Sequence, residues 1–68
     1  MPLKIKKLKA ALSKASCYSI SAKGSHTKWR HPDLPGATIT LSGKDGDDAK
    51  PYQIDDVQDF LGKLGKEL

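Results

Sequence analysis

The sequence has one cysteine, no long apolar run and few aromatic side chains. A single cysteine, Cys17, excludes an internal disulfide and a site built on paired cysteine ligands. No stretch is apolar enough to span a bilayer, and lysines interrupt the opening MPLKIKKLKAAL too often for a secretory signal. With 68 residues we expect one small domain, 1–68, and a cytoplasmic location.

Acidic side chains are absent from the first 32 residues. That half carries eight cations, whereas residues 33–68 carry four lysines and eight acids, so the net charge of +4 is the sum of +8 and −4. A basic half of this kind favours a polyanionic partner such as nucleic acid. The alternative is a dipolar surface that only keeps the protein soluble.

The hydrophobic periodicity predicts five elements in the order α-β-β-β-α. A first helix is expected from Leu3 to Ala15, because apolar residues recur at positions 5, 8, 12 and 15 between lysines. Alternating runs then predict strands over 17–22, 26–31 and 37–42, with a break at Lys23-Gly24-Ser25. The last helix is expected from about Tyr52 to Leu64, with Gly65 at its C-terminal stop. The first helix could lie on a membrane surface, but a place in the core is the simpler interpretation.

Short connections between the strands favour an antiparallel three-stranded sheet with both helices on its apolar face. Trp29 is expected to pack into that core rather than to stack on a nucleic-acid base. In the first strand, the alternation directs Tyr18, Ile20 and Ala22 toward the core. It directs Cys17, Ser19 and Ser21 toward the open face. A bulge of one residue would break this alternation.

The same parity places His26, Lys28 and Arg30 together on the open, polar face, with Lys23 nearby at the hairpin tip. Imidazole is the side chain that exchanges protons most readily near neutral pH, and the cations suit the oxygens of a phosphate. By composition alone, the pattern also fits a water-facing hairpin without chemistry.

Other potential sites are weaker. His31 falls on the core side, where a structural hydrogen bond is expected. Ser25 and His26 are neighbours on a strand and point to opposite faces, and no acid completes a triad with them. The segment GKDGDDAKP lacks the spacing of a calcium loop, because Ala49 and Lys50 occupy the fifth and sixth positions counted from Asp45, so we interpret it as an acidic turn.

The segment AKGSHTKWRHPD resembles the HicA family, the toxin half of bacterial HicA–HicB toxin–antitoxin pairs. The matching features are Lys23-Gly24-Ser25-His26 at the hairpin, His31-Pro32-Asp33, Lys50-Pro51 before the last helix and the order of the elements. The resemblance implies a double-stranded-RNA-binding-like α-β-β-β-α fold and an mRNA interferase. It also implies that His26 is the catalytic histidine, that Gly24 holds the turn presenting it, and that a HicB-like antitoxin covers this face. No metal or other cofactor is expected.

Three functions follow from these observations. The first is a metal-independent endoribonuclease that cleaves mRNA with His26 as general base or acid. Its expected RNA-binding residues are Lys23, Gly24, Ser25, Lys28 and Arg30. The second is a non-catalytic RNA-binding module on the same surface. The third is a protein-interaction module that uses the acidic C-terminal helix, because residues 45–59 hold six acids and only one lysine. That acidic segment should repel RNA, which leaves the first helix and the open sheet for RNA binding.

Overall fold

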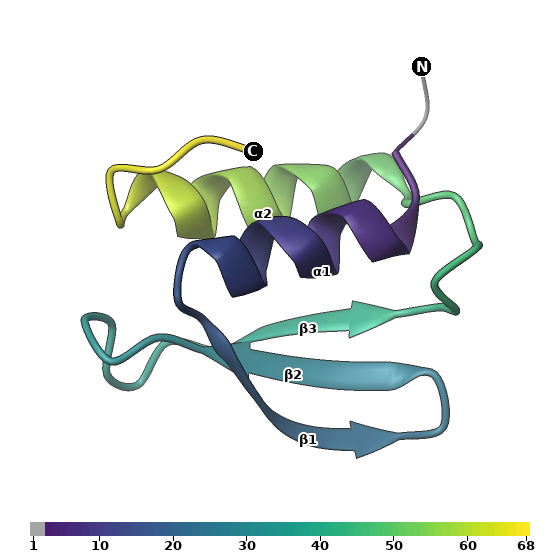
Figure 1. Cartoon of the computed structure of the whole chain (residues 1–68), viewed down its shortest axis with the longest axis horizontal. Helices are drawn as coiled ribbons and strands as arrows, with labels where there is room; N and C mark the ends of the chain where they lie inside the picture. Colours follow the sequence, from purple (N-terminus) through teal and green to yellow (C-terminus); the bar gives the residue numbers. More distant parts are fainter. Residues whose placement is uncertain (1–2) are drawn as a thin grey trace.

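Two helices and three strands follow one another in the predicted α-β-β-β-α order, which is confirmed. The computed structural model describes residues 3–68, apart from the side chains of residues 21 and 22. The elements are α1 (Ile5–Lys14), β1 (Tyr18–Lys23), β2 (His26–Arg30), β3 (Ile39–Ser42) and α2 (Pro51–Gly62). The strands form an antiparallel sheet in the order β1-β2-β3, and in Figure 1 α2 lies nearer to β3 than to β1.

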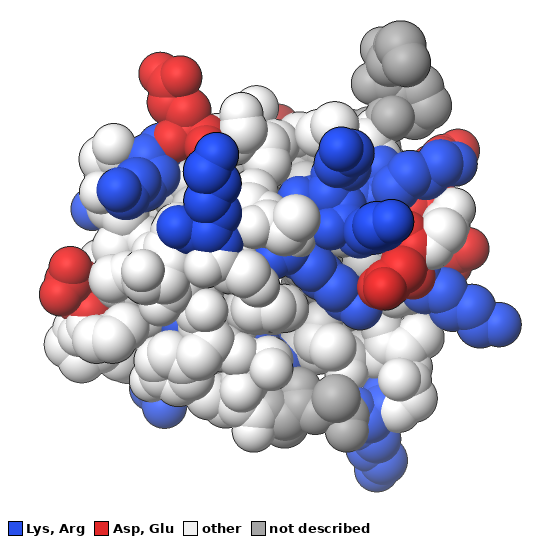
Figure 2. Space-filling view, viewed as in Figure 1, with Lys and Arg blue, Asp and Glu red and all other residues white. Residues whose placement is uncertain are grey.

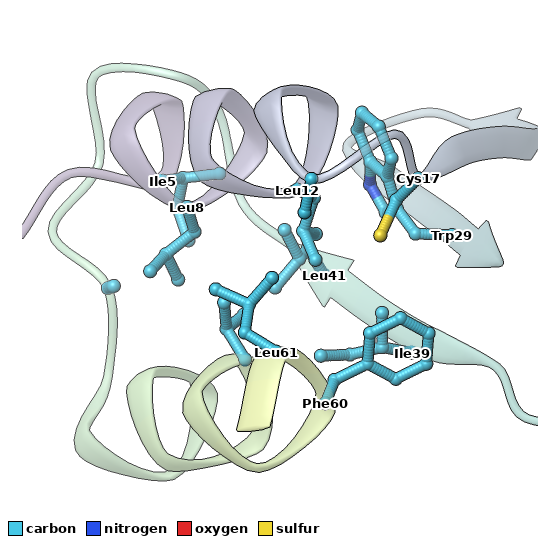
Figure 3. Close-up of a cluster of buried hydrophobic side chains, with 12 residues drawn as sticks. Ile5, Leu8, Leu12, Cys17, Trp29, Ile39, Leu41, Phe60 and Leu61 are labelled. Carbon is cyan, nitrogen blue, oxygen red and sulfur yellow. The ribbon is translucent and has the colours of Figure 1, made fainter. Parts of the chain in front are cut away.

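One cluster of buried apolar side chains joins the two helices to β2 and β3 (Figure 3). Leu8, Leu12, Leu41 and Val57 are fully excluded from solvent, and each such side chain contributes about 1.5–3 kcal/mol of burial free energy. The cluster confirms the helical periodicity, because every core position predicted on the first helix is buried. Its largest members are Ile5, Leu8, Leu12, Trp29, Ile39, Leu41, Val57, Phe60 and Leu61.

The C-terminal end of α1 is closed by a Schellman motif that fixes where the chain enters the sheet. The Cys17 N–H donates to the Leu12 carbonyl at 2.9 Å, and the Ser16 N–H donates to the Ser13 carbonyl at 3.0 Å. This motif requires a left-handed residue, and Ser16 takes that place with a φ of 71°. Glycine usually occupies such a position, because a Cβ atom makes the conformation costly.

The N-terminal end of α1 is closed by the acidic loop, residues 43–49, which follows β3. The Ile5 N–H donates to the Asp47 carbonyl at 2.9 Å, and the Lys6 N–H donates to the Asp45 carbonyl at 3.1 Å. The first N–H groups of a helix have no partner within it, so the loop supplies acceptors that α1 lacks. The predicted acidic turn therefore acts as the N-terminal cap of a distant helix.

The predicted parity of the first strand is wrong at its beginning. Cys17 is buried, whereas Tyr18 and Ile20 are 46% and 44% exposed. Two features cause the difference: the Schellman motif brings Cys17 against Leu12, and the register shifts between Ser19 and Ser21, leaving Ile20 as a bulge. Ser19 consequently pairs with Trp29 and lies on the core face of the sheet, where Tyr18 was predicted. In Figure 1, β1 is also the strand farthest from α2, which agrees with the exposure of Tyr18 and Ile20.

We predict that Ser16→Gly stabilises the protein by about 0.5–1 kcal/mol, because glycine adopts the left-handed conformation without the Cβ penalty. Denaturant-induced unfolding would measure the change. Ser13→Gly is the matched control: Ser13 lies within α1, so glycine there should destabilise the protein by about 0.5 kcal/mol. A loss of stability in Ser16→Gly would contradict the strain argument.

Candidate active site

The β1–β2 hairpin presents His26 at the first position of β2. Lys23 and His26 pair across the two strands, so Gly24 and Ser25 alone form the turn. Gly24 has a φ of 59°, and Ser25 is not among the residues with positive φ, which is the pattern of a type II′ turn. The Ser25 carbonyl accepts the Gly43 N–H at 3.0 Å, which ties the turn to the end of β3.

Cross-strand pairing brings the predicted polar residues onto one face of the sheet. His26 lies opposite Lys23 on β1 and opposite Ser42 on β3, and Lys28 lies opposite Thr40. Opposite residues in an antiparallel pair project to the same face, so the parity predicted for β2 and β3 is confirmed. Lys23, His26, Lys28 and Thr40 line one shallow depression, which we call the His26 depression.

Arg30 extends this face toward the other end of β2. It pairs with Tyr18, so an exposed phenol ring and a guanidinium lie side by side where the sequence parity placed only polar residues. Arg30 is two residues beyond Lys28 on the same face, about 7 Å along the strand. Tyr18 is the open-face residue that sequence reasoning missed, and the β1 bulge that moves it there leaves no clear signature in the sequence.

The His26 depression is basic and open to solvent. None of its lining residues is acidic, and Lys23, His26 and Lys28 are all exposed. Apart from the side chains of residues 21 and 22, which the structure does not describe, the His26 ring forms no hydrogen bond with a side chain or with the backbone of residues 3–68. Its imidazole is therefore free to accept a proton from a bound ligand, beside cations that attract phosphate oxygens.

The basic surface of α1 differs from the His26 depression, because part of it is neutralised within the protein. Lys9 pairs with Asp45 at 2.7 Å, and Lys4 pairs with Asp48. Figure 2 shows lysines gathered over α1, with acidic side chains of the loop beside them. In the part of the chain that the structure describes, no ion pair involves Lys23, Lys28 or Arg30. Positive charge is thus available on the open sheet face.

His31 has the structural role expected from its parity. The Asp33 N–H donates to Nδ1 at 3.0 Å, and Nε2 lies 3.0 Å from the Ala15 carbonyl. Because Nδ1 accepts a hydrogen bond, the ring proton is assigned to Nε2, which donates to Ala15. The imidazole therefore connects the end of β2 to the last carbonyls of α1 and is not available for catalysis.

Cys17 and Trp29 also have structural positions. Cys17 is buried, not on the open face, and burial raises the pKa of its thiol, so the reactive thiolate is disfavoured at neutral pH. Trp29 is 8% exposed and its Nε1–H donates to Thr27 Oγ1 at 3.1 Å, which confirms packing rather than base stacking. Ser25 is exposed in the turn and contributes its carbonyl.

Residues 3–68 contain neither a cluster of metal-ligating side chains nor a helix that could span a membrane. No group of three or more histidine, cysteine, aspartate or glutamate side chains is arranged to hold a metal ion. No helix in this range has the length and apolar character needed to cross a membrane.

An α-β-β-β-α chain with an exposed histidine among cations on its open sheet face has the arrangement expected of a HicA-like toxin. The family model described as the HicA toxin of bacterial toxin–antitoxin systems matches residues 5–65. The match covers most of the chain, so the chain belongs to the HicA toxin family, and the resemblance drawn from its motifs is confirmed. No curated protein and no solved structure matches the chain.

We predict that His31 contributes to stability and that His26 contributes little. His31→Ala should lower the free energy of unfolding by about 1–2 kcal/mol, because it removes the side chain that bonds Ala15 and Asp33. His26→Ala should change it by less than about 0.5 kcal/mol, because His26 is exposed and makes no such bonds. Urea unfolding of both variants checks this, and equal destabilisation would contradict the assignment.

Proposed function

We propose that the protein is the toxin of a toxin–antitoxin pair and an endoribonuclease that cleaves mRNA at the His26 depression. The observation that carries this proposal is the meeting of an exposed imidazole with Lys23 and Lys28 in a depression without acids. RNA phosphates supply the matching negative charge, and the ribose 2′-hydroxyl supplies a nucleophile. Membership of a toxin family supports the same activity. The whole chain, 1–68, acts as one HicA-like domain in this proposal.

In the proposed reaction, His26 acts first as the general base. Its neutral imidazole takes the proton of a ribose 2′-hydroxyl as the 2′ oxygen forms a bond to the adjacent phosphorus. The bond between phosphorus and the 5′ oxygen breaks, and that oxygen takes a proton from water. The imidazolium then returns its proton to water. The products are a 2′,3′-cyclic phosphate and a 5′-hydroxyl end, and no metal takes part.

The cations serve the phosphate and the RNA on either side of it. Lys23, opposite His26, and Lys28, on the same face, are placed to stabilise the charge that builds on the phosphate oxygens. Arg30 binds a neighbouring phosphate further along the strand. Gly24 and Ser25 contribute through the turn, which keeps bulky side chains away from the RNA.

We further propose that a HicB-like antitoxin covers this face and blocks access of RNA to His26. The reaction takes place in the cytoplasm, where mRNA is available.

We predict that His26→Gln abolishes cleavage. Glutamine keeps the polarity and approximate size of the side chain but cannot accept a proton near neutral pH, and loss of a general base costs about 100- to 10,000-fold in rate. A labelled single-stranded RNA is incubated with each protein in the presence of EDTA, and the ends of the fragments are identified. Wild type should release fragments with 2′,3′-cyclic phosphate ends.

Two results would contradict this assignment. Cleavage by His26→Gln at the wild-type rate would remove His26 from the mechanism. Absence of cleavage by folded wild-type protein that still binds the RNA would favour a non-catalytic RNA-binding module. The control variant, His31→Gln, should keep most of the activity wherever it remains folded, because His31 is not part of the depression.

We also predict that the double variant Lys28→Glu/Arg30→Glu has a lower affinity for RNA, and that this affinity depends less on the salt concentration. Loss of two phosphate contacts should reduce the slope of log affinity against log salt by about 1.4 for a single strand. Fluorescence anisotropy at several salt concentrations measures this slope. The control variant Lys63→Glu/Lys66→Glu makes the same change in net charge near the C-terminus and should leave the slope nearly unchanged. An equal decrease of the slope in this control would show that net charge alone is responsible, which would contradict the assigned phosphate contacts.

A further inference from the structure

The outer edge of β3 has no neighbouring strand within the described residues. The sheet ends with β3, whose inner edge pairs with β2 over residues 39–42. A strand at the edge of a sheet presents a row of backbone donors and acceptors that can pair with another chain. Whether such an edge is usable depends on which backbone groups point outward and on what lies beside them.

Two hydrogen bonds at the end of β3 show which residues point outward. The Gly43 N–H donates to the Ser25 carbonyl, so Gly43 faces the β2 side. The Ser42 carbonyl accepts from Gln53 Nε2 of α2 at 2.8 Å, so Ser42 faces away from β2. Successive residues of a strand alternate between the two edges, and therefore Thr40 and Thr38 also direct their N–H and C=O groups outward.

These outward groups of Thr38 and Thr40 are free. Within residues 3–68, no hydrogen bond outside the β2–β3 ladder uses the backbone of either residue. By contrast, the next outward carbonyl, that of Ser42, is already occupied by Gln53. The free edge is therefore short and begins just beyond the contact between Gln53 and the sheet.

A groove runs beside this free edge, between β3 and the C-terminal half of α2. Residues 37–40 line one side and α2 lines the other, with the nearly buried Phe60 at its floor. Phe60 is 6% exposed and packs beside Ile39, as Figure 3 shows. The groove thus combines free backbone groups with an apolar floor, the two features that strand addition uses for affinity and for side-chain selection.

The charge of the groove selects the occupant. Asp56 and Asp59 line it from α2, both exposed, and Lys63 is the one cation among the lining residues. Neither aspartate forms an ion pair with a residue of the described chain. Charges beside a free edge disfavour strands of the same sign, so this edge repels acidic strands and attracts basic ones.

We propose that the β3 edge is a docking site for a basic, extended segment of a partner protein, which adds as a fourth strand. Its backbone pairs with Thr38 and Thr40. One side chain of the partner contacts the Phe60 floor, and its lysines or arginines bind Asp56 and Asp59. The site is distinct from the His26 depression, and this proposal does not depend on ribonuclease activity.

The test uses a blocked eight-residue peptide that alternates lysine with valine, titrated into isotope-labelled protein and followed by NMR. We expect the Thr38 and Thr40 amides to shift and to become protected from hydrogen exchange. Asp56→Lys/Asp59→Lys should weaken binding at least about tenfold, because like charges then face each other. Asp55→Lys/Glu67→Lys carries the same change in net charge outside the groove, and its affinity should stay within about twofold of wild type.

Further peptides separate strand addition from attraction between charges. N-methylation removes backbone donors, and alternate N–H groups of a strand point to opposite edges, so one peptide is methylated at its valines and another at its lysines. One of the two should bind at least about tenfold more weakly than the unmethylated peptide. A peptide that alternates glutamate with valine should not bind. Absence of binding by the lysine peptide, undiminished binding by both methylated peptides, or equal losses in the two charge variants would overturn the proposal. Protection of Thr38 and Thr40 without peptide at high protein concentration would also overturn it, by showing that a second copy is the occupant.

Discussion

The side-chain amide of Gln53 connects the parts of the structure that both proposed sites need. Gln53 is 2% exposed, the only buried polar side chain of the described residues. Its Oε1 accepts the Lys50 N–H at 2.8 Å, which closes the start of α2, and its Nε2 donates to the Ser42 carbonyl. Because a buried amide is costly without partners, these bonds fix the position of α2 against the end of β3. The same contact is made at Ser42, which pairs with His26, and it marks where the free edge ends.

The helices, the core and most of the open face could be predicted from the sequence, because each depends on a local period. The apolar spacing of α1 specifies Ile5, Leu8 and Leu12 without knowledge of their partners, and strict alternation in β2 places His26 and Lys28 together. The start of β1 could not be predicted, because its parity depends on the cap of α1 and on the Ile20 bulge. Gln53 has a local signal, since it occupies the third position of α2 where a capping glutamine is favoured, but its bond to Ser42 is a tertiary contact.

The two proposed sites are neighbours through Thr40. Its side chain lines the His26 depression, and its backbone faces the free edge and the acidic groove. The sheet therefore separates two kinds of charge by one strand: cations on the open face and carboxylates beside the edge of β3. RNA and a basic protein segment would be directed to different places by electrostatics, yet a partner held at the edge would lie beside bound RNA. The two proposals therefore use separate surfaces that meet at Thr40.

The capping of α1 by the acidic loop has a consequence for how the protein is made. The N–H groups of Ile5 and Lys6 receive their acceptors from Asp47 and Asp45, about forty residues later in the chain. A contact between residues this distant in sequence forms late, because the long loop between them must close before the contact contributes to stability. Because α1 precedes that loop in the sequence, its first turn is completed only after the loop beyond β3 has been synthesised. A chain translated only as far as β2 already carries His26 and its neighbouring cations but still lacks the loop that caps α1.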